Sequence, residues 1–169
     1  LLDDSFLDRI EKVRGPIDRW LLLGSKGQCQ IFLSHEEPGL KLMDLACEKL
    51  SIMPKSEGAY WIRMNLALMK SFREDPLVWK DALRIAEKAE LPPLQQINLV
   101  YLNSIYFLAV SRIYLKLGRV EAARAASSEQ INLIENHSAF NYLELCYLTH
   151  AESLRACGEN EAADTYLRK

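Results

Sequence analysis

The sequence has no apolar run of 18 or more residues and very little net charge. A helix needs roughly 20 apolar residues to cross a bilayer, so no membrane-spanning helix is expected. The chain does not open with the charged and then apolar residues of a secretory signal. Its formal net charge is −2, which provides no basic surface for nucleic acid or for an anionic membrane. We therefore expect neither a membrane protein nor a direct nucleic-acid binder.

Cysteines are few and lack the spacing of a metal site. The four, Cys29, Cys47, Cys146 and Cys157, lie within helical patterns, where a free cysteine behaves as a small buried hydrophobe. Cys146 and His150 are four residues apart and can lie side by side on a helix, but two ligands are too few for a tetrahedral metal. We expect packing roles for both, no metal, no cofactor, and a reducing, intracellular compartment, either cytoplasm or nucleus.

Catalytic motifs are also missing. The segment 23–27 (LGSKG) is rich in glycine, but it lacks the Gly-Lys-Ser/Thr ending and the preceding strand of a phosphate-binding P-loop. No Gly-x-Ser-x-Gly element is present for a hydrolase nucleophile. Adjacent acidic residues lie near turns and helix starts, where the helix dipole favours them. The sequence therefore indicates a protein without enzymatic activity of its own.

Helical periodicity is what the sequence does contain. Apolar residues recur at the 3.6-residue spacing of a helix, and no longer run alternates as a strand does. Prolines, glycines and capping residues divide this pattern into segments. The sequence thus predicts an all-α fold. The expected helices span 1–14, 17–34, 40–52, 56–73, 75–90, 94–117, 120–136, a segment capped by Ser138, and 159–169.

Some of these segments carry further predictions. Gly24 and Gly27 each cost about 1 kcal/mol relative to alanine within a helix, which suggests a break there. Residues 35–39 (HEEPG) are expected to form a turn. The segment 94–117 is apolar nearly all round and should be the most enclosed helix. The buried stripe of the segment 56–73 is predicted to comprise Trp61, Met64, Leu68 and Phe72.

A self-similar segment lies near the C-terminus. Residues 106–129 and 146–169, 40 residues apart, are identical at five of 24 positions, where composition alone gives roughly one or two. Each copy places a glycine where its first helix ends, because glycine adopts the left-handed conformation there without strain. Such a period is typical of an α-solenoid of helical hairpins. The identical pairs are Leu108/Leu148, Gly118/Gly158, Glu121/Glu161, Ala122/Ala162 and Ala123/Ala163.

The two copies resemble the tetratricopeptide-repeat (TPR) superfamily, in the looser variant of about 40 residues found in multidomain signalling ATPases, cyclases and transcription activators. His150 departs from the pattern, since it occupies the position of the aliphatic Val110 in the other copy. The matching positions are the small Ser111 and Ala151, the larger Tyr114 and Leu154, and the repeated Gly118, Gly158, Ala123 and Ala163.

With the remaining helices paired in the same way, the chain is expected to form one domain, an α–α superhelix of about four hairpins. Their approximate ranges are 1–52, 56–90, 94–136 and 138–169. Because the sequence opens on leucine and its last helix is short, we expect it to be a fragment of a longer protein. Exposed repeat ends would also allow oligomerisation.

A stack of hairpins presents an extended concave face lined by its first helices. We therefore predict a protein–protein interaction, scaffold or regulatory module of a larger signalling or transcription-regulating protein. The alternative is a domain that senses a small-molecule effector and controls an attached ATPase, cyclase or DNA-binding domain. An enclosed pocket with a few converging polar groups would favour that alternative over an open face.

Candidate partner-binding residues lie beside the apolar seams of the first helices rather than within them. The two clear repeats supply a mixed, mainly basic strip suited to an acidic or peptide partner, and Tyr60 and Asn103 are further candidates for exposed groove residues. The predicted site residues are Tyr101, Arg112, Lys116, Glu152 and Arg155.

Overall fold

The computed structural model describes residues 4–52, 56–88, 97–137 and 142–169, with side chains described from residue 5 in the first range and from residue 100 in the third. These residues form nine helices and no strand, which confirms the predicted all-α fold. The helices are α1 (Asp4–Arg14), α2 (Pro16–Phe32), α3 (Glu36–Leu50), α4 (Glu57–Ser71), α5 (Pro76–Glu87), α6 (Ile97–Lys116), α7 (Val120–His137), α8 (Leu143–Ala156) and α9 (Asn160–Tyr166).

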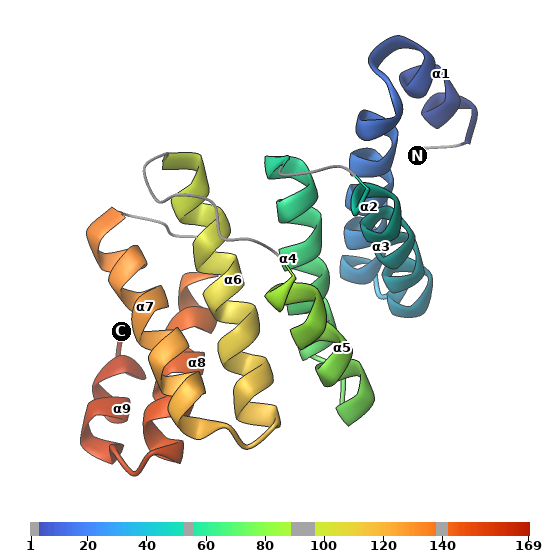
Figure 1. Cartoon of the computed structure of the whole chain (residues 1–169). Helices are drawn as coiled ribbons and strands as arrows, with labels where there is room; N and C mark the ends of the chain where they lie inside the picture. The colour runs from blue at the N-terminus through green and yellow to red at the C-terminus, as the bar shows by residue number, and fades with distance from the viewer. Residues whose placement is uncertain (1–3, 53–55, 89–96, 138–141) are drawn as a thin grey trace.

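The helices pack as successive pairs along the chain (Figure 1). α2 packs on α3, α4 on α5, α6 on α7, and α8 on α9, while α1 lies against α2. The first helices of the pairs, α2, α4, α6 and α8, also contact one another in order. Within the described ranges the second helices, α3, α5, α7 and α9, do not contact each other. The first helices therefore form one continuous layer, which we call the first-helix layer.

The two sequence repeats close their hairpins with the same turn. Gly118 and Gly158 have φ angles of 70° and 84°, a left-handed conformation that favours glycine. The next amide donates across each turn to the carbonyl five residues back, over 2.8 Å from Arg119 to Tyr114 and 2.9 Å in the second copy. These bonds satisfy helix-end carbonyls that otherwise lack a partner. The predicted role of the two glycines is thus confirmed.

Two predicted helix starts are also confirmed. The Ser56 hydroxyl accepts a hydrogen bond from the Ala59 amide at 3.1 Å, and the Asp75 carboxylate accepts one from the Leu77 amide at 2.8 Å. Each satisfies an amide in the first turn of its helix. The predicted cap Ser138 lies outside the described residues.

The predicted break in α2 is wrong, because this helix is continuous. Its two glycines instead allow other helices to approach closely. A Cβ atom on Gly27 would lie 2.6 Å from the carbonyl oxygen of Gly39 in α3, and one on Gly24 would lie 2.4 Å from Cδ1 of Ile62 in α4. Close packing of the helices therefore outweighs the low helix propensity of glycine.

The predicted turn at 35–39 is also wrong, since α3 begins at Glu36. Pro38 lies in the first turn of the helix, where a missing amide hydrogen breaks no helical bond. Gly39 lies at the crossing with α2, where a Cβ atom would be 2.5 Å from the carbonyl oxygen of Gly27. The short stretch of turn-forming residues is thus part of a helix crossing.

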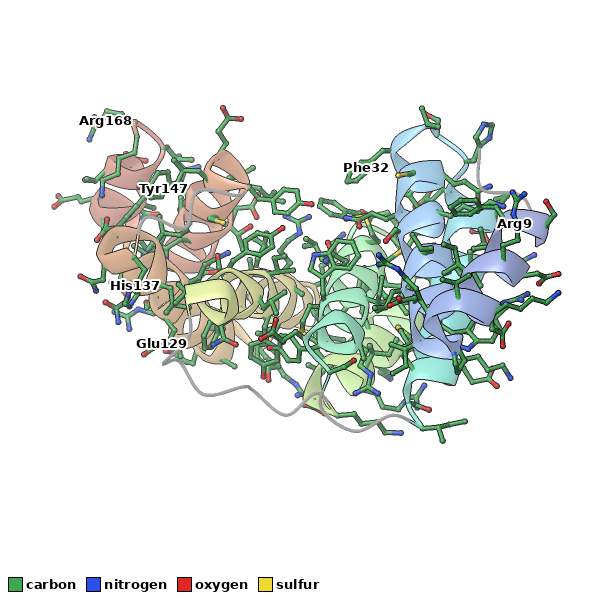
Figure 2. All side chains as sticks on the ribbon, turned by 90° about the horizontal axis from the view of Figure 1, so that it is seen from above. Arg9, Phe32, Glu129, His137, Tyr147 and Arg168 are labelled. Atoms are coloured by element: carbon green, nitrogen blue, oxygen red, sulfur yellow. The ribbon has the colours of Figure 1, made fainter. Side chains whose placement is uncertain are left out.

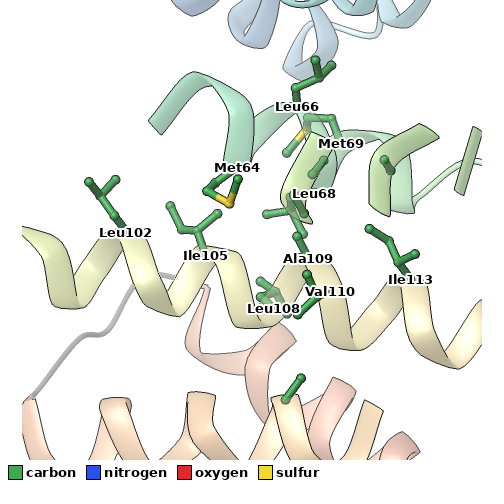
Figure 3. Close-up of a cluster of buried hydrophobic side chains, with 14 of the residues drawn as sticks. Met64, Leu66, Leu68, Met69, Leu102, Ile105, Leu108, Ala109, Val110 and Ile113 are labelled. Atoms are coloured by element: carbon green, nitrogen blue, oxygen red, sulfur yellow. The ribbon is translucent and has the colours of Figure 1, made fainter. Parts of the chain in front are cut away.

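The largest buried cluster lies between α4 and α6 (Figure 3). α6 contacts α4, α5, α7 and α8, and its side chains Ile105, Leu108 and Ile113 are almost fully buried. α4 is enclosed to a similar degree, because every residue of 64–71 is buried. Phe72, predicted in the buried stripe, is 43% exposed. The centre of the stack is therefore formed by both α4 and α6, and Phe72 lies partly at the surface.

The repeated alanines Ala123 and Ala163 have no solvent exposure. Replacing Ala123 with leucine is expected to lower the free energy of unfolding by about 1 to 3 kcal/mol, because a larger side chain must enter a packed site. Urea unfolding followed by circular dichroism measures this change. The matched control is Ala125→Leu on the exposed side of α7. Equal losses in the two variants would contradict the proposed packing role.

Candidate functional site

The five residues predicted to bind a partner lie on the first helices, but the structure does not gather them into one strip. Arg112 and Glu152 interact across the first-helix layer. Lys116 and Arg155 each form an ion pair with a neighbouring element. Tyr101 belongs to a separate cluster near the start of α8.

Arg112 connects three of the first helices. Its guanidinium carbon lies 4.4 Å from the centre of the Phe72 ring at the end of α4, and its Nε donates to the Ser71 hydroxyl at 3.3 Å. The charge of the Glu152 carboxylate in α8 acts on the same guanidinium. We call Phe72, Arg112 and Glu152 the Arg112 strip. It crosses α4, α6 and α8.

The guanidinium of Arg112 lacks a close counterion. No ion pair within 4.0 Å joins it to a carboxylate of the described residues. Burial lowers the pKa of Arg112 below its ordinary value, and the charge of Glu152 only partly offsets this. Partly buried cations are normally stabilised by carboxylates, and Lys70 contacts two of them. Arg112 is therefore a ready anchor for an anionic group.

Apolar side chains are exposed on the elements of the first-helix layer. Phe72 is 43% exposed, and Leu148, one helical turn before Glu152 on α8, is 42% exposed. At the α2 end of the layer, Phe32 is 62% exposed and points toward the α8 end of the stack (Figure 2). The Arg112 strip thus combines one cation, one carboxylate and accessible apolar surface, as peptide-binding surfaces do.

Lys116 is directed toward the turn between α4 and α5. Its ammonium lies 2.8 Å from the Glu74 carboxylate and 5.0 Å from the centre of the Trp79 ring. The Trp79 indole in turn donates to the Arg73 carbonyl at 2.6 Å. Lys116 therefore fastens α6 to the preceding helix pair.

Arg155 and Glu152 differ in their surroundings. Arg155 lies 2.8 Å from the Asp164 carboxylate in α9, and both side chains are about half exposed. This pair joins the two helices of the last hairpin. Glu152 is exposed on α8 and, among the predicted residues, is the one that interacts with Arg112.

Tyr101 lies in a polar cluster that draws on α2, α4, α6 and the residue just before α8. Burial raises the pKa of Tyr142, Tyr101 raises it further, and a hydrogen bond with Gln28 of α2 partly offsets both. Gln28 Nε2 also donates to Asn65 Oδ1 of α4 at 3.0 Å. Gln28 and Asn65 were not among the predicted site residues. A signal for Asn65 is present in the sequence, since it is the single amide within the otherwise apolar segment 64–69.

Tyr60 and Asn103 are not exposed groove residues, so that prediction is wrong. They are 7% and 1% exposed, and the Tyr60 hydroxyl donates to Asn103 Oδ1 at 3.4 Å. Burial raises the pKa of Tyr60. Each polar end thus satisfies the other inside the core, which removes the cost of burying either one alone.

Cys146 and His150 are buried between helices, as predicted. His150 Nδ1 lies 2.9 Å from the Ser127 hydroxyl of α7, and the ring meets Tyr166 of α9 edge to face. The Gln130 amide donates to Cys146 Sγ at 2.9 Å. Burial lowers the pKa of His150, with Arg124 adding to the effect, so the neutral ring is favoured. In the described part of the chain, no group of three or more potential ligands for a metal ion occurs.

A groove that the sequence did not predict lies between the second helices α3 and α5. Its volume is about 310 Å³, and the end of α4 forms its floor. Lys70, whose side chain is 9% exposed, extends from this floor to Asp44 of α3 at 2.7 Å and to Asp81 of α5 at 2.6 Å. Arg73 similarly contacts Glu36 and Glu37 of α3. Lys70 therefore joins α3 and α5, which do not contact each other directly, whereas Arg73, two residues after the end of α4, binds α3 alone.

No helix in the described ranges has the length and hydropathy needed to cross a membrane. No protein-family model matches the sequence, and neither a curated protein nor a solved structure matches it significantly. The function of this chain is therefore inferred from its residues and their geometry.

Proposed function

We propose that this chain is a non-catalytic, TPR-like helical-repeat module that binds a protein or peptide partner within a larger signalling or transcription-regulating protein. Its partner surface is the Arg112 strip. The observation that carries the proposal is the partly buried guanidinium of Arg112, which stacks on Phe72 and has no ion pair with a described carboxylate.

The surroundings of Arg112 indicate the chemistry of the partner. A carboxylate of the partner would supply the counterion that this site lacks, through a charge-assisted hydrogen bond. Apolar side chains beside that carboxylate would cover the exposed surfaces of Phe72 and Leu148. The negative charge of Glu152 disfavours a second acid beside it. The expected partner is a segment with one acidic residue flanked by apolar residues.

The test selects peptides from a displayed library with the parent chain and then compares how two arginine variants bind them. The parent chain should select peptides with an acidic residue between apolar residues. Arg112→Gln should bind these peptides about tenfold more weakly, because it loses one hydrogen bond between charged groups. The matched control is Arg119→Gln, which removes an exposed arginine from the turn after α6. Added salt should weaken binding to the parent chain and have less effect on Arg112→Gln.

Two results would contradict this proposal. One is selection of peptides without any acidic preference. The other is equal binding by Arg112→Gln and Arg119→Gln when circular dichroism shows both variants folded. The alternative, an effector-sensing domain, stays a prediction. Binding of a small molecule at the cluster of Gln28, Tyr101 and Tyr142 would favour it.

A further inference from the structure

The groove between α3 and α5 lies apart from the Arg112 strip, because second helices form its walls. Its charges are arranged around Lys70. The two aspartates that bind this ammonium differ in their remaining contacts: Asp81 accepts from Lys70 with one carboxylate oxygen and from Arg84 with the other, at 2.6 Å in each case. Asp81 therefore has a cation on both of its oxygens.

Asp44 has a cation on only one oxygen. Its Oδ1 accepts from Lys70 at 2.7 Å, and no hydrogen bond from a described cation reaches its Oδ2. The side chain lines the groove and is 48% exposed. On the α5 wall, Arg84 binds the second oxygen of Asp81. The second oxygen of Asp44 on the α3 wall has no such cation, so it can accept a hydrogen bond from a positively charged donor.

The rest of the lining suits an aliphatic chain. Leu40, Leu77 and Val78 contribute apolar surface to the groove, and Leu77 at its edge is 73% exposed. A lysine side chain has an apolar stem and a cationic end, which together match such an edge and a carboxylate within it. The exposed edge also favours a side chain carried by a polypeptide, because small-molecule sites usually enclose most of their ligand.

We propose that this groove is a second partner site, which receives the lysine side chain of a partner polypeptide. The stem of the lysine packs on Leu77 and Val78, and its ammonium donates to Asp44 Oδ2. Lys41, an exposed cation in the same wall, opposes this binding by charge repulsion. The site does not depend on the Arg112 strip, so either proposal can fail without the other.

The experiment titrates the ¹⁵N-labelled chain with acetyl-Leu-Lys-Leu-amide and with the same peptide carrying norleucine in place of lysine. The lysine peptide should shift amide resonances in 40–44 and 77–81, and the norleucine peptide, which has the stem without the charge, should bind about tenfold more weakly. Butylamine should bind more weakly than the lysine peptide, because it lacks the flanking backbone. Equal affinity of norleucine peptide or butylamine would overturn the proposal.

Two variants on α3 test the proposed roles of Asp44 and Lys41 in binding the lysine peptide. Asp44→Asn should weaken binding of the lysine peptide about tenfold, whereas Lys41→Gln should strengthen it. The matched control is Glu48→Gln, which removes an acidic group one turn beyond Asp44 and outside the groove. If Glu48→Gln has the same effect as Asp44→Asn, the response reflects the net charge of the helix and the proposed site is wrong.

Discussion

Replacing Lys70 with methionine is expected to lower the free energy of unfolding by about 3 kcal/mol. The change leaves Asp44 and Asp81 beside each other without the ammonium between them. Removing one partner of a buried ion pair costs roughly 3 to 5 kcal/mol. The low end applies because both aspartates are partly exposed and solvent screens their repulsion. Urea unfolding at pH 7 measures the difference.

The same network predicts a dependence on pH. Burial raises the pKa of Asp81, but hydrogen bonds from Lys70 and Arg84 outweigh burial and hold the pKa below its ordinary value of 3.8. Because the pKa is lower in the folded state, Asp81 contributes stability above about pH 4 and loses it as the pH falls through the folded pKa. This acid-dependent loss should be smaller in Lys70→Met, which keeps only Arg84.

A nearby lysine provides the control for this experiment. Lys80→Met removes an exposed cation from α5, next to Asp81 in sequence, and should change the free energy of unfolding by no more than about 0.5 kcal/mol. If Lys70→Met is no less stable than Lys80→Met, the bridge between α3 and α5 makes no net contribution. The triple variant Lys70→Met, Asp44→Asn, Asp81→Asn should recover part of the loss, because it removes the repelling carboxylates.

Replacing Gly27 with alanine is expected to cost about 3 kcal/mol or more. A Cβ atom there would lie 2.6 Å from the backbone carbonyl oxygen of Gly39, so α2 and α3 must separate to admit it. This cost exceeds the roughly 1 kcal/mol that alanine otherwise contributes within a helix. Thermal unfolding of the variant measures the net effect.

Gly24→Ala is the matched comparison, in the same helix and with the same propensity gain. Its Cβ atom would lie 2.4 Å from Cδ1 and 3.0 Å from both Cγ atoms of the buried Ile62, a side chain that can shift more readily than backbone. We expect a smaller loss than in Gly27→Ala, since a side chain rather than backbone must move and the gain in propensity offsets part of the cost. A Gly27→Ala variant as stable as Gly24→Ala would show that the crossing tolerates an added methyl group.

Local features of the fold could be predicted because each depends on residues within one or two turns of the chain. Ser56 and Asp75 cap helices through amides two or three residues away. Gly118 closes its turn through a bond that spans only five residues, from Arg119 to Tyr114. Such short-range hydrogen bonds and backbone preferences are visible in any single segment.

The candidate site could be predicted only in part. Periodicity predicts Arg112 beside the apolar seam of α6, but its lack of a close counterion depends on α4 and α8, which are distant in sequence. Periodicity placed Phe72 in the core because it follows Leu68 at helical spacing. The structure leaves it 43% exposed at the end of α4, beneath the guanidinium of Arg112.

By itself, the sequence determined the all-α class, most helix boundaries and the repeated turn, since these follow from local propensity and periodicity. Tertiary structure decided which helices approach closely and which charges meet. Gly27 does not break α2 and Gly39 does not form a turn. The two glycines lie at the crossing of α2 and α3, because neither has a side chain that would keep the helices apart. Lys70 joins Asp44 and Asp81, 26 and 11 residues away, because helix packing alone brings their atoms within hydrogen-bond distance.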